Sequence, residues 1–234
     1  MNRTFLKGVS HGIPIGLGYL SVAFTFGMQA VAKGLSPAQA LLISMTNVTS
    51  AGQFAGLPLI LAQSSLIEVA MTQLIINLRY ALMSLSLSQR LDKSMTTLHR
   101  LIFSFMNTDE IFAVASGQPD KVGRIYLYGL MSTPYIGWSL GTILGAVAGQ
   151  LLPDFLRTAM GIAIYGMFLA IILPPARKER PVRVVVLLAV AMSLMFRYLP
   201  VLTNVSSGFV IIICAVAAST VGALLFPVGK EGAP

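Results

Sequence analysis

The sequence is poor in charge, cysteine and histidine, and each shortage excludes a class of protein. Only 10% of the 234 residues are charged and 56% are hydrophobic, which is unlike a soluble globular protein. The lone Cys214 lies in an apolar run, so it offers no disulfide or metal cluster and indicates packing. His11 and His99 stand near the ends of apolar runs, and no H-E-x-x-H or phosphate-loop motif occurs. We therefore expect no enzyme activity, no metal site and no cofactor.

Long apolar runs fill the sequence instead, and its mean hydropathy is +0.80. A bilayer core about 30 Å thick is crossed by roughly 20 apolar helical residues. The stretch before Gly12 lacks a long apolar core, so we expect no removable signal peptide. Seven candidate spans can be recognised, at about 12–33, 38–63, 66–88, 125–149, 156–174, 183–199 and 205–226.

These runs predict an all-α polytopic membrane protein with about seven transmembrane helices in a single domain, 1–234. The formal net charge of +8 comes from basic residues in the loops, which form no basic, aromatic-studded face for nucleic acid. Lys and Arg gather in cytoplasmic loops, and seven crossings with the N-terminus outside leave only Arg3, Lys7 and Arg157 outside. An eighth crossing at 101–117 with the N-terminus inside fits less well, so we expect a re-entrant or interfacial segment there. The residues placed inside are Lys33, Arg90, Lys93, Arg100, Lys121, Arg124, Arg177, Lys178, Arg180, Arg183 and Lys230.

A weak internal repeat suggests two halves of three helices each, at about 12–88 and 125–199. Between them lies a linker at 89–124, and a final helix follows at 205–226. The odd number of crossings between equivalent helices predicts that the halves are inverted, as in many secondary transporters. The repeated residues are Gly27 and Gly145, Pro37 and Pro153, and Arg79-Tyr80 and Arg197-Tyr198.

Polar residues in the second span predict a broken helix. The run TNVTSAGQFAGLP contains Asn47, Ser50, Gly52 and Gln53 and ends at Pro58. Such a sequence at membrane depth is tolerated where the freed backbone groups line a cavity, and a half-helix N-terminus there favours an anionic group. Alternatively, the glycines provide a close helix contact.

The third span carries a polar stripe and an arginine. Asn77 and Tyr80 lie on one helical face, while Arg79 lies off that face and roughly 14 Å or more from either end of the span. An arginine at that depth needs a carboxylate, carbonyl groups or an anionic ligand. It serves either a binding site or a structural ion pair.

A glycine stripe marks the fourth span. Gly137, Gly141, Gly145 and Gly149 recur every four residues, so they strip one helix face of side chains. This pattern predicts close packing against another helix.

Two adjacent acids, Asp109 and Glu110, interrupt the apolar run at 101–117. Asn107 followed three residues later by Glu110 has the spacing of a capping box. Neighbouring carboxylates on a helix point about 100° apart, so they cannot serve one ligand in the same way. We expect Glu110 to cap the helix and Asp109 to meet Arg79 or an ammonium group.

Taken in order, these motifs resemble the AzlC family, the large subunit of bacterial branched-chain amino-acid exporters. The resemblance rests on Gly27 with Gly34, AGQF at 51–54, INLRYALM at 76–83 and TDEIFA at 108–113. It implies a multi-pass protein of the bacterial inner membrane that exports hydrophobic amino acids by a secondary mechanism. It also implies a small multi-spanning membrane partner of the AzlD type.

The residues are compatible with that substrate, because a branched-chain amino acid is a zwitterion with an apolar tail. Arg79 or backbone N–H groups near Ser50 to Gly52 would bind the carboxylate. Asp109 or Glu110 would bind the ammonium group or carry a proton. An ion-coupled importer, a channel for another small solute and a non-transporting scaffold remain as alternatives. The substrate-binding candidates are Asn47, Ser50, Gly52, Gln53, Asn77, Arg79, Tyr80 and Asp109, with Asp109 and Glu110 as candidate proton-coupling or structural acids.

Overall fold

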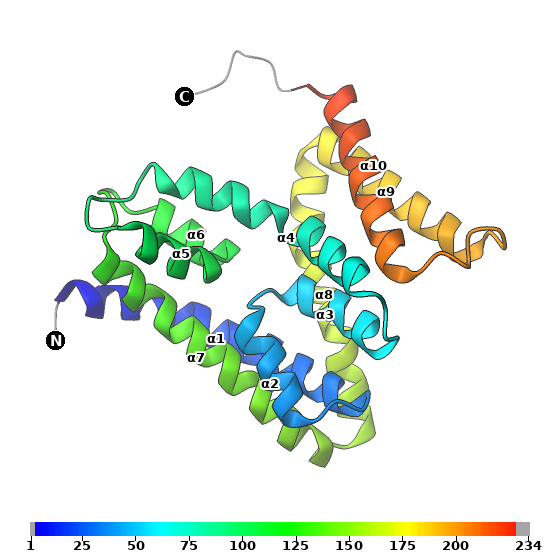
Figure 1. Ribbon diagram of the computed structural model, residues 1–234, viewed down its shortest axis with the longest axis horizontal. Coiled ribbons are helices and arrows are strands. Elements are labelled where there is room, and N and C mark those ends of the chain that lie inside the picture. The colour runs from blue at the N-terminus through cyan, green and yellow to red at the C-terminus, as the bar shows by residue number, and fades with distance from the viewer. Residues whose placement is uncertain (1–2, 228–234) are drawn as a thin grey trace. The chain divides into compact units, whose positions relative to one another are not determined.

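The computed structural model describes residues 3–227, apart from the side chains at positions 163, 164, 167 and 171. This range folds into helices joined by short loops, which confirms the predicted all-α class (Figure 1). Four of the described helices, α1, α4, α9 and α10, are long and apolar enough to cross a membrane. The elements are α1 (Arg3–Ala32), α2 (Pro37–Thr46), α3 (Ser50–Leu61), α4 (Leu66–Ser88), α5 (Thr97–Phe105), α6 (Asp109–Ser116), α7 (Arg124–Ala148), η1 (Gly149–Leu151), α8 (Asp154–Lys178), α9 (Arg180–Tyr198) and α10 (Ser207–Leu225).

The helices gather into two compact units, and each is described by itself. The first contains Met1–Leu57 and Ile76–Gly161, and the second contains Pro58–Ile75 and Ile162–Pro234. The predicted single domain over 1–234 stays a prediction.

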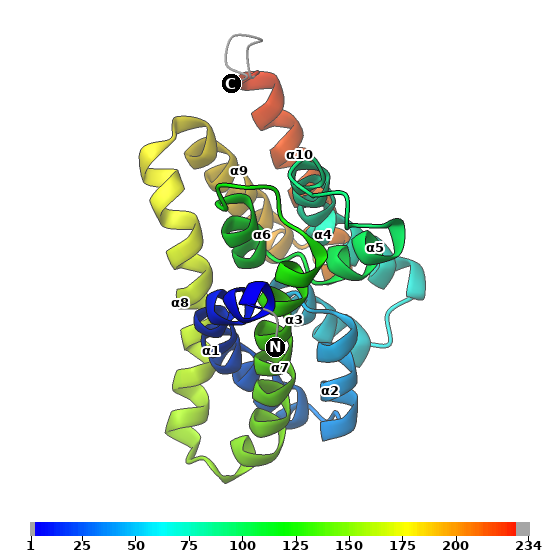
Figure 2. The same ribbon diagram turned by 90° about the vertical axis from the view of Figure 1, so that its left-hand side faces the viewer.

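Helices α1 and α7 form the core of the first unit and lie side by side in both views (Figures 1 and 2). Gly137, Gly141 and Gly145 of α7 lie directly against main-chain atoms of α1, and Gly149 lies against Met28. A Cβ at any of these positions would overlap α1, so the glycines allow a close approach. The predicted packing role of this stripe is confirmed.

The two helices run parallel, because their contacts advance together along both chains. Gly8 faces Gly129 near the start of each helix, and Phe24 faces Gly145 near the end. An inverted repeat requires the helices at 12–33 and 125–149 to be antiparallel, so that expectation is wrong for this pair. Gly27 and Gly145 recur because both lie on the shared contact surface.

The predicted span at 38–63 is a hairpin of two short helices, α2 and α3, which we call the first hairpin. Ala40 of α2 and Leu57 of α3 pack in one cluster with Ala30, near the C-terminal end of α1. The helices have 10 and 12 residues, about 15 and 18 Å, so neither crosses a bilayer. The prediction of one crossing is therefore wrong, whereas the predicted break is confirmed at the tip, residues 47–49.

Helices α5 and α6 form a second hairpin that enters the first unit from the opposite end. Met95, just before α5, and Ala115 of α6 share a cluster with Tyr126, near the N-terminal end of α7. The tip at 106–108 lies between the two helices. The predicted re-entrant or interfacial segment at 101–117 is therefore a helical hairpin, and its place relative to the membrane stays a prediction.

The tips of the two hairpins meet halfway along α1. Val48 of the first tip and Met106 of the second belong to one buried cluster with Tyr19 and Trp138. An inverted relation therefore exists between α1 with the first hairpin and α4 with the second hairpin. The sequence suggests it between 12–88 and 125–199 instead. Helix α1 is followed by a hairpin that returns from its C-terminal end, and α4, whose Leu87 reaches the opposite end, is followed by the other hairpin.

Basic residues gather at one end of the first unit. Arg3, Lys7, Lys121 and Arg124 line one cavity where α1 and α7 begin. They cannot lie on opposite sides of a membrane, so the predicted separation of Arg3 and Lys7 from Lys121 and Arg124 is wrong. Lys and Arg concentrate in cytoplasmic loops, so we expect this end to face the cytoplasm. Lys230, expected inside, falls outside the described residues.

The second unit contains a buried carboxylate that the sequence analysis did not single out. Glu68, in the first turn of α4, accepts hydrogen bonds from the Ser206 hydroxyl at 2.5 Å and the Gly208 N–H at 3.1 Å. It thereby caps the N-terminus of α10, where a negative charge suits the helix dipole. We interpret Glu68 as structural. Further along, Val185 of α9 lies against Gly222 of α10, near opposite ends of the two helices, which are therefore antiparallel.

The orientation of the first unit can be tested with single cysteines in a Cys214→Ser background. In intact cells, an impermeant maleimide should label Lys33→Cys, at the end of the first unit opposite the cavity. It should label Lys7→Cys and Lys121→Cys only after the cells are permeabilised, because both lie at the end that we expect to face the cytoplasm. Labelling of Lys7→Cys but not Lys121→Cys in intact cells would contradict the parallel arrangement of α1 and α7.

Candidate functional site at the hairpin tips

A pocket of about 200 Å³ lies between the tips of the two hairpins and the adjoining face of α4. At about 30 Å³ per water-sized group, it holds roughly seven such groups, which suits a small amino acid rather than a peptide or nucleotide. The pocket mixes apolar side chains with hydroxyl and amide groups. Its lining residues are Thr46, Asn47, Val48, Thr49, Asn77, Tyr80, Ser104, Phe105, Asn107 and Thr108.

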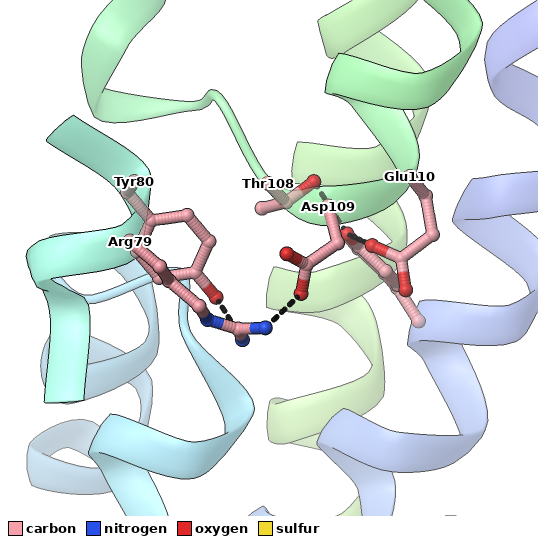
Figure 3. Close-up of polar contacts among 6 residues, drawn as sticks. Arg79, Tyr80, Thr108, Asp109 and Glu110 are labelled. Carbon is pink, nitrogen blue, oxygen red and sulfur yellow. Dashed lines mark hydrogen bonds and ion pairs between the residues drawn. The ribbon is translucent and has the colours of Figure 1, made fainter. Parts of the chain in front are cut away.

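An ion pair between α4 and α6 borders this pocket (Figure 3). The Arg79 guanidinium lies 2.7 Å from the Asp109 carboxylate and donates a hydrogen bond to the Tyr80 hydroxyl at 3.0 Å. It also lies 4.8 Å from the centre of the Tyr80 ring. The predicted pairing of Arg79 with Asp109 is confirmed. The side chains are 46% and 41% exposed, so the pair is open to a ligand.

Glu110 points away from this pair and toward α1. The Tyr19 hydroxyl lies 2.5 Å from the Glu110 carboxylate and 2.6 Å from the Thr108 hydroxyl, so it is within hydrogen-bonding distance of both groups. Helix α6 begins at Asp109 with Thr108 as its N-cap, so the expected capping box of Asn107 and Glu110 is wrong. The reason is that α1 supplies a hydroxyl partner that local spacing cannot reveal.

Asn107 provides a buried polar atom at the pocket. Its side chain is only 2% exposed and its amide donates to the Ser84 hydroxyl at 2.9 Å. The Oδ1 atom of the same side chain has no hydrogen-bond partner among the residues that the structure describes. An unsatisfied buried acceptor is unfavourable by roughly 1–3 kcal/mol. This atom would therefore gain from a ligand donor or a water molecule in the pocket.

Two helix N-termini meet at the tips as well. Helix α3 begins at Ser50, directly after the first tip, and α6 begins at Asp109, directly after the second. Each helix directs the N–H groups of its first turn toward its own tip, where the helix dipole is positive. The predicted half-helix N-terminus at Ser50 is confirmed.

The part of the chain that contains this site matches a known protein family. The family described as AzlC protein matches the chain over residues 14–152. The chain belongs to the AzlC family. The match runs from α1 to the end of η1, so it includes both hairpins, the pocket and the Arg79–Asp109 pair.

The relatives of this AzlC protein are membrane proteins. It is 30% identical over 190 residues to the inner membrane protein YgaZ of Escherichia coli, covering 76% of each chain. It is 34% identical over 184 residues to an uncharacterized membrane protein of Archaeoglobus fulgidus, covering 78% of this chain and 80% of the relative. A Helicobacter pylori membrane protein is 28% identical over 172 residues, covering 70% of this chain and 75% of the relative. No solved structure matches this AzlC chain.

The predicted substrate-binding residues of this AzlC protein divide into four groups. Asn47, Asn77 and Tyr80 line the pocket, and Arg79 and Asp109 border it through Tyr80 and Thr108. In the first turn of α3, Ser50 and Gly52 follow the tip without lining the pocket. Gln53 is buried and donates to the Ser44 hydroxyl at 2.7 Å, which in turn contacts Thr142 of α7 at 2.6 Å. Gln53 thus ties the first hairpin to the core.

The sequence analysis missed Tyr19, Thr108 and the pocket role of Asn107. One signal could have found Asn107, because Asn47 and Asn107 both stand at a helix break in an apolar run. No comparable signal marks Tyr19, a single aromatic residue in a long apolar helix.

Replacing Tyr19 should loosen the second hairpin at its tip. Tyr19→Phe removes the hydroxyl bound to Glu110 and Thr108, and a hydrogen bond to a charged group contributes about 1.5–3 kcal/mol. Backbone hydrogen exchange over 106–112 should accelerate by about tenfold or more, measured by mass spectrometry in detergent. Tyr128→Phe is the matched control, since its hydroxyl bonds to His99 at the base of the same hairpin. Equal acceleration at the tip in both variants would argue against the tether.

Proposed function

We propose that this AzlC protein is the large subunit of a secondary transporter that exports branched-chain and other hydrophobic amino acids. Leucine, isoleucine, valine and methionine are the proposed substrates, and the bacterial inner membrane is the proposed location. The Arg79–Asp109 pair beside a small pocket is the observation that carries this proposal. Family membership supports a role related to membrane transport.

The ion pair matches the charges of an amino acid. The Arg79 guanidinium binds the substrate carboxylate, and the Asp109 carboxylate binds the ammonium group. When the substrate binds, Arg79 exchanges the Asp109 carboxylate for the substrate carboxylate, and Asp109 exchanges the guanidinium for the ammonium group. No charge at membrane depth therefore loses its partner. Because substrate and pair are both neutral overall, the occupied site has no net charge.

The pocket lining suits the rest of such a substrate. Val48 and Phe105 provide apolar contacts for an aliphatic tail. The Asn107 Oδ1 atom accepts a hydrogen bond from the ammonium group, which satisfies the unpaired acceptor. A volume of about 200 Å³ favours a single amino acid over a peptide.

The opposed hairpins suggest how access alternates between the two sides. The first hairpin packs near the C-terminal end of α1 and the second near the N-terminal end of α7, so the pocket at their tips lies between the two ends of the unit. Movement of one hairpin at a time opens the pocket to one side, which is the requirement for transport by alternating access. Glu110, held by Tyr19 beside the pocket, is the proposed proton carrier that links this movement to the proton gradient.

The proposal includes a second, small membrane subunit of the AzlD type. Arg79 and Asp109 are partly exposed even though α4 is apolar enough to span a membrane. Charged groups at such depth require a protein or water environment, not lipid. A multi-spanning partner beside α4 would provide that environment.

Efflux of preloaded, isotope-labelled leucine tests the proposed function in cells that co-express the partner. Arg79→Ala and Asp109→Asn should each slow efflux by about ten- to a hundredfold, because each leaves one charged end of the substrate without its partner. Asp154→Asn and Arg157→Ala are matched controls, since they break an exposed ion pair within the first turn of α8. These controls should export leucine at the normal rate.

An uncoupler that collapses the proton gradient should abolish export against a leucine gradient. Normal export by both Arg79→Ala and Asp109→Asn at normal protein levels would refute the assigned site. Efflux that persists unchanged with the uncoupler would favour a channel.

A further inference from the structure

A second cavity, of about 580 Å³, lies at the end of the first unit that we expect to face the cytoplasm. It is formed by the start of α1, the start of α7 and the loop at 118–123, so it is separate from the pocket at the hairpin tips. Four cations and two carboxylates line it, which gives it a positive balance. The charged residues are Arg3, Lys7, Lys121 and Arg124, with Asp92 and Asp120.

The four cations are available to bind a ligand. Within the described residues, none of them lies within ion-pairing distance of a carboxylate. The Asp92 carboxylate instead accepts a hydrogen bond from the Ser94 N–H at 2.7 Å. The Arg124 guanidinium lies 3.3 Å from His99, which is no anion. The two carboxylates of the lining therefore offset only part of the positive charge of the four cations.

Two helix dipoles add to this charge. Because α1 and α7 run parallel, both direct their N-terminal ends to this end of the unit. Neither helix has an acidic residue in its first turn, and the N-cap of α7 is Gly123, which has no side chain of its own. The Ser94 hydroxyl accepts a hydrogen bond from the Arg124 N–H at 3.0 Å, and the Asp92 carboxylate lies beside Gly123. The two helix dipoles and the four cations together favour an anion at this end.

We infer that this cavity binds a phosphate-bearing anion. The same chemistry is offered by the headgroup of an anionic phospholipid of the inner leaflet and by free phosphate. The cavity holds far more than one phosphate at about 30 Å³ per water-sized group, and Val122, Ile125 and Tyr126 add apolar lining. These features favour a lipid headgroup with part of its glycerol backbone.

The test measures lipid binding to the full chain with Lys7→Gln and Lys121→Gln combined. Native mass spectrometry counts phosphatidylglycerol molecules retained from mixed micelles, with phosphatidylcholine as the neutral comparison. The wild-type protein should retain phosphatidylglycerol, and the double variant should bind it about thirtyfold more weakly, since each basic residue near the surface contributes about a factor of five. A matched control, Lys33→Gln with Arg157→Gln, removes two cations outside the cavity and should bind normally.

Asp120→Asn gives a result of opposite sign in the same assay. Removing a carboxylate from the cavity should tighten phosphatidylglycerol binding by a few fold, an effect that a damaged fold would not produce. Inorganic phosphate is added alone in a second arm. If millimolar phosphate displaces the lipid, the soluble anion is also a ligand, and if it does not, the lipid headgroup is the ligand. Equal losses in the cavity variant and the control, or equal retention of both lipids, would overturn the inference.

Discussion

The close contact between α1 and α7 is the constraint on which the rest of the first unit depends. Glycines on both helices remove the side chains that would hold them apart, so main chain meets main chain along their full length. In a membrane, where lipid tails are as apolar as leucine, such close packing replaces hydrophobic burial as the source of association. The parallel direction of the pair follows from which glycines face each other.

This pair supports both hairpins at their tips. Tyr19 of α1 packs edge-to-face on Trp138 of α7, with ring centres 5.0 Å apart, and both belong to the cluster that holds Val48 and Met106. The helices of each hairpin are too short to cross a membrane, so each hairpin turns back at this cluster. A polar pocket halfway along the unit is the result, bordered by the ion pair on which the proposed function rests.

Much of this arrangement could be predicted from local residue types. Gly, Ser and Thr around Asn47 predicted a helix break, the glycine stripe on α7 predicted close packing, and the isolation of Arg79 predicted a partner such as Asp109. Spatial relations could not be predicted in the same way. A broken apolar run has the same composition whether its second half continues across the membrane or turns back, so 38–63 was assigned as a crossing. The direction of α7 relative to α1 and the bond from Tyr19 to Glu110 depend on packing between residues far apart in the sequence, which leaves no periodic signal.

The central claim, that two opposed hairpins meet around a substrate, is tested most directly by cross-linking their tips in membranes. Val48→Cys and Met106→Cys are combined in a Cys214→Ser background and treated with a short bifunctional maleimide. The structure predicts an intramolecular cross-link for this pair, slowed by added leucine, and none for Val48→Cys with Met95→Cys, because Met95 belongs to the cluster at the base of the second hairpin. Failure of the tip pair to cross-link, or equal cross-linking of both pairs, would contradict the account.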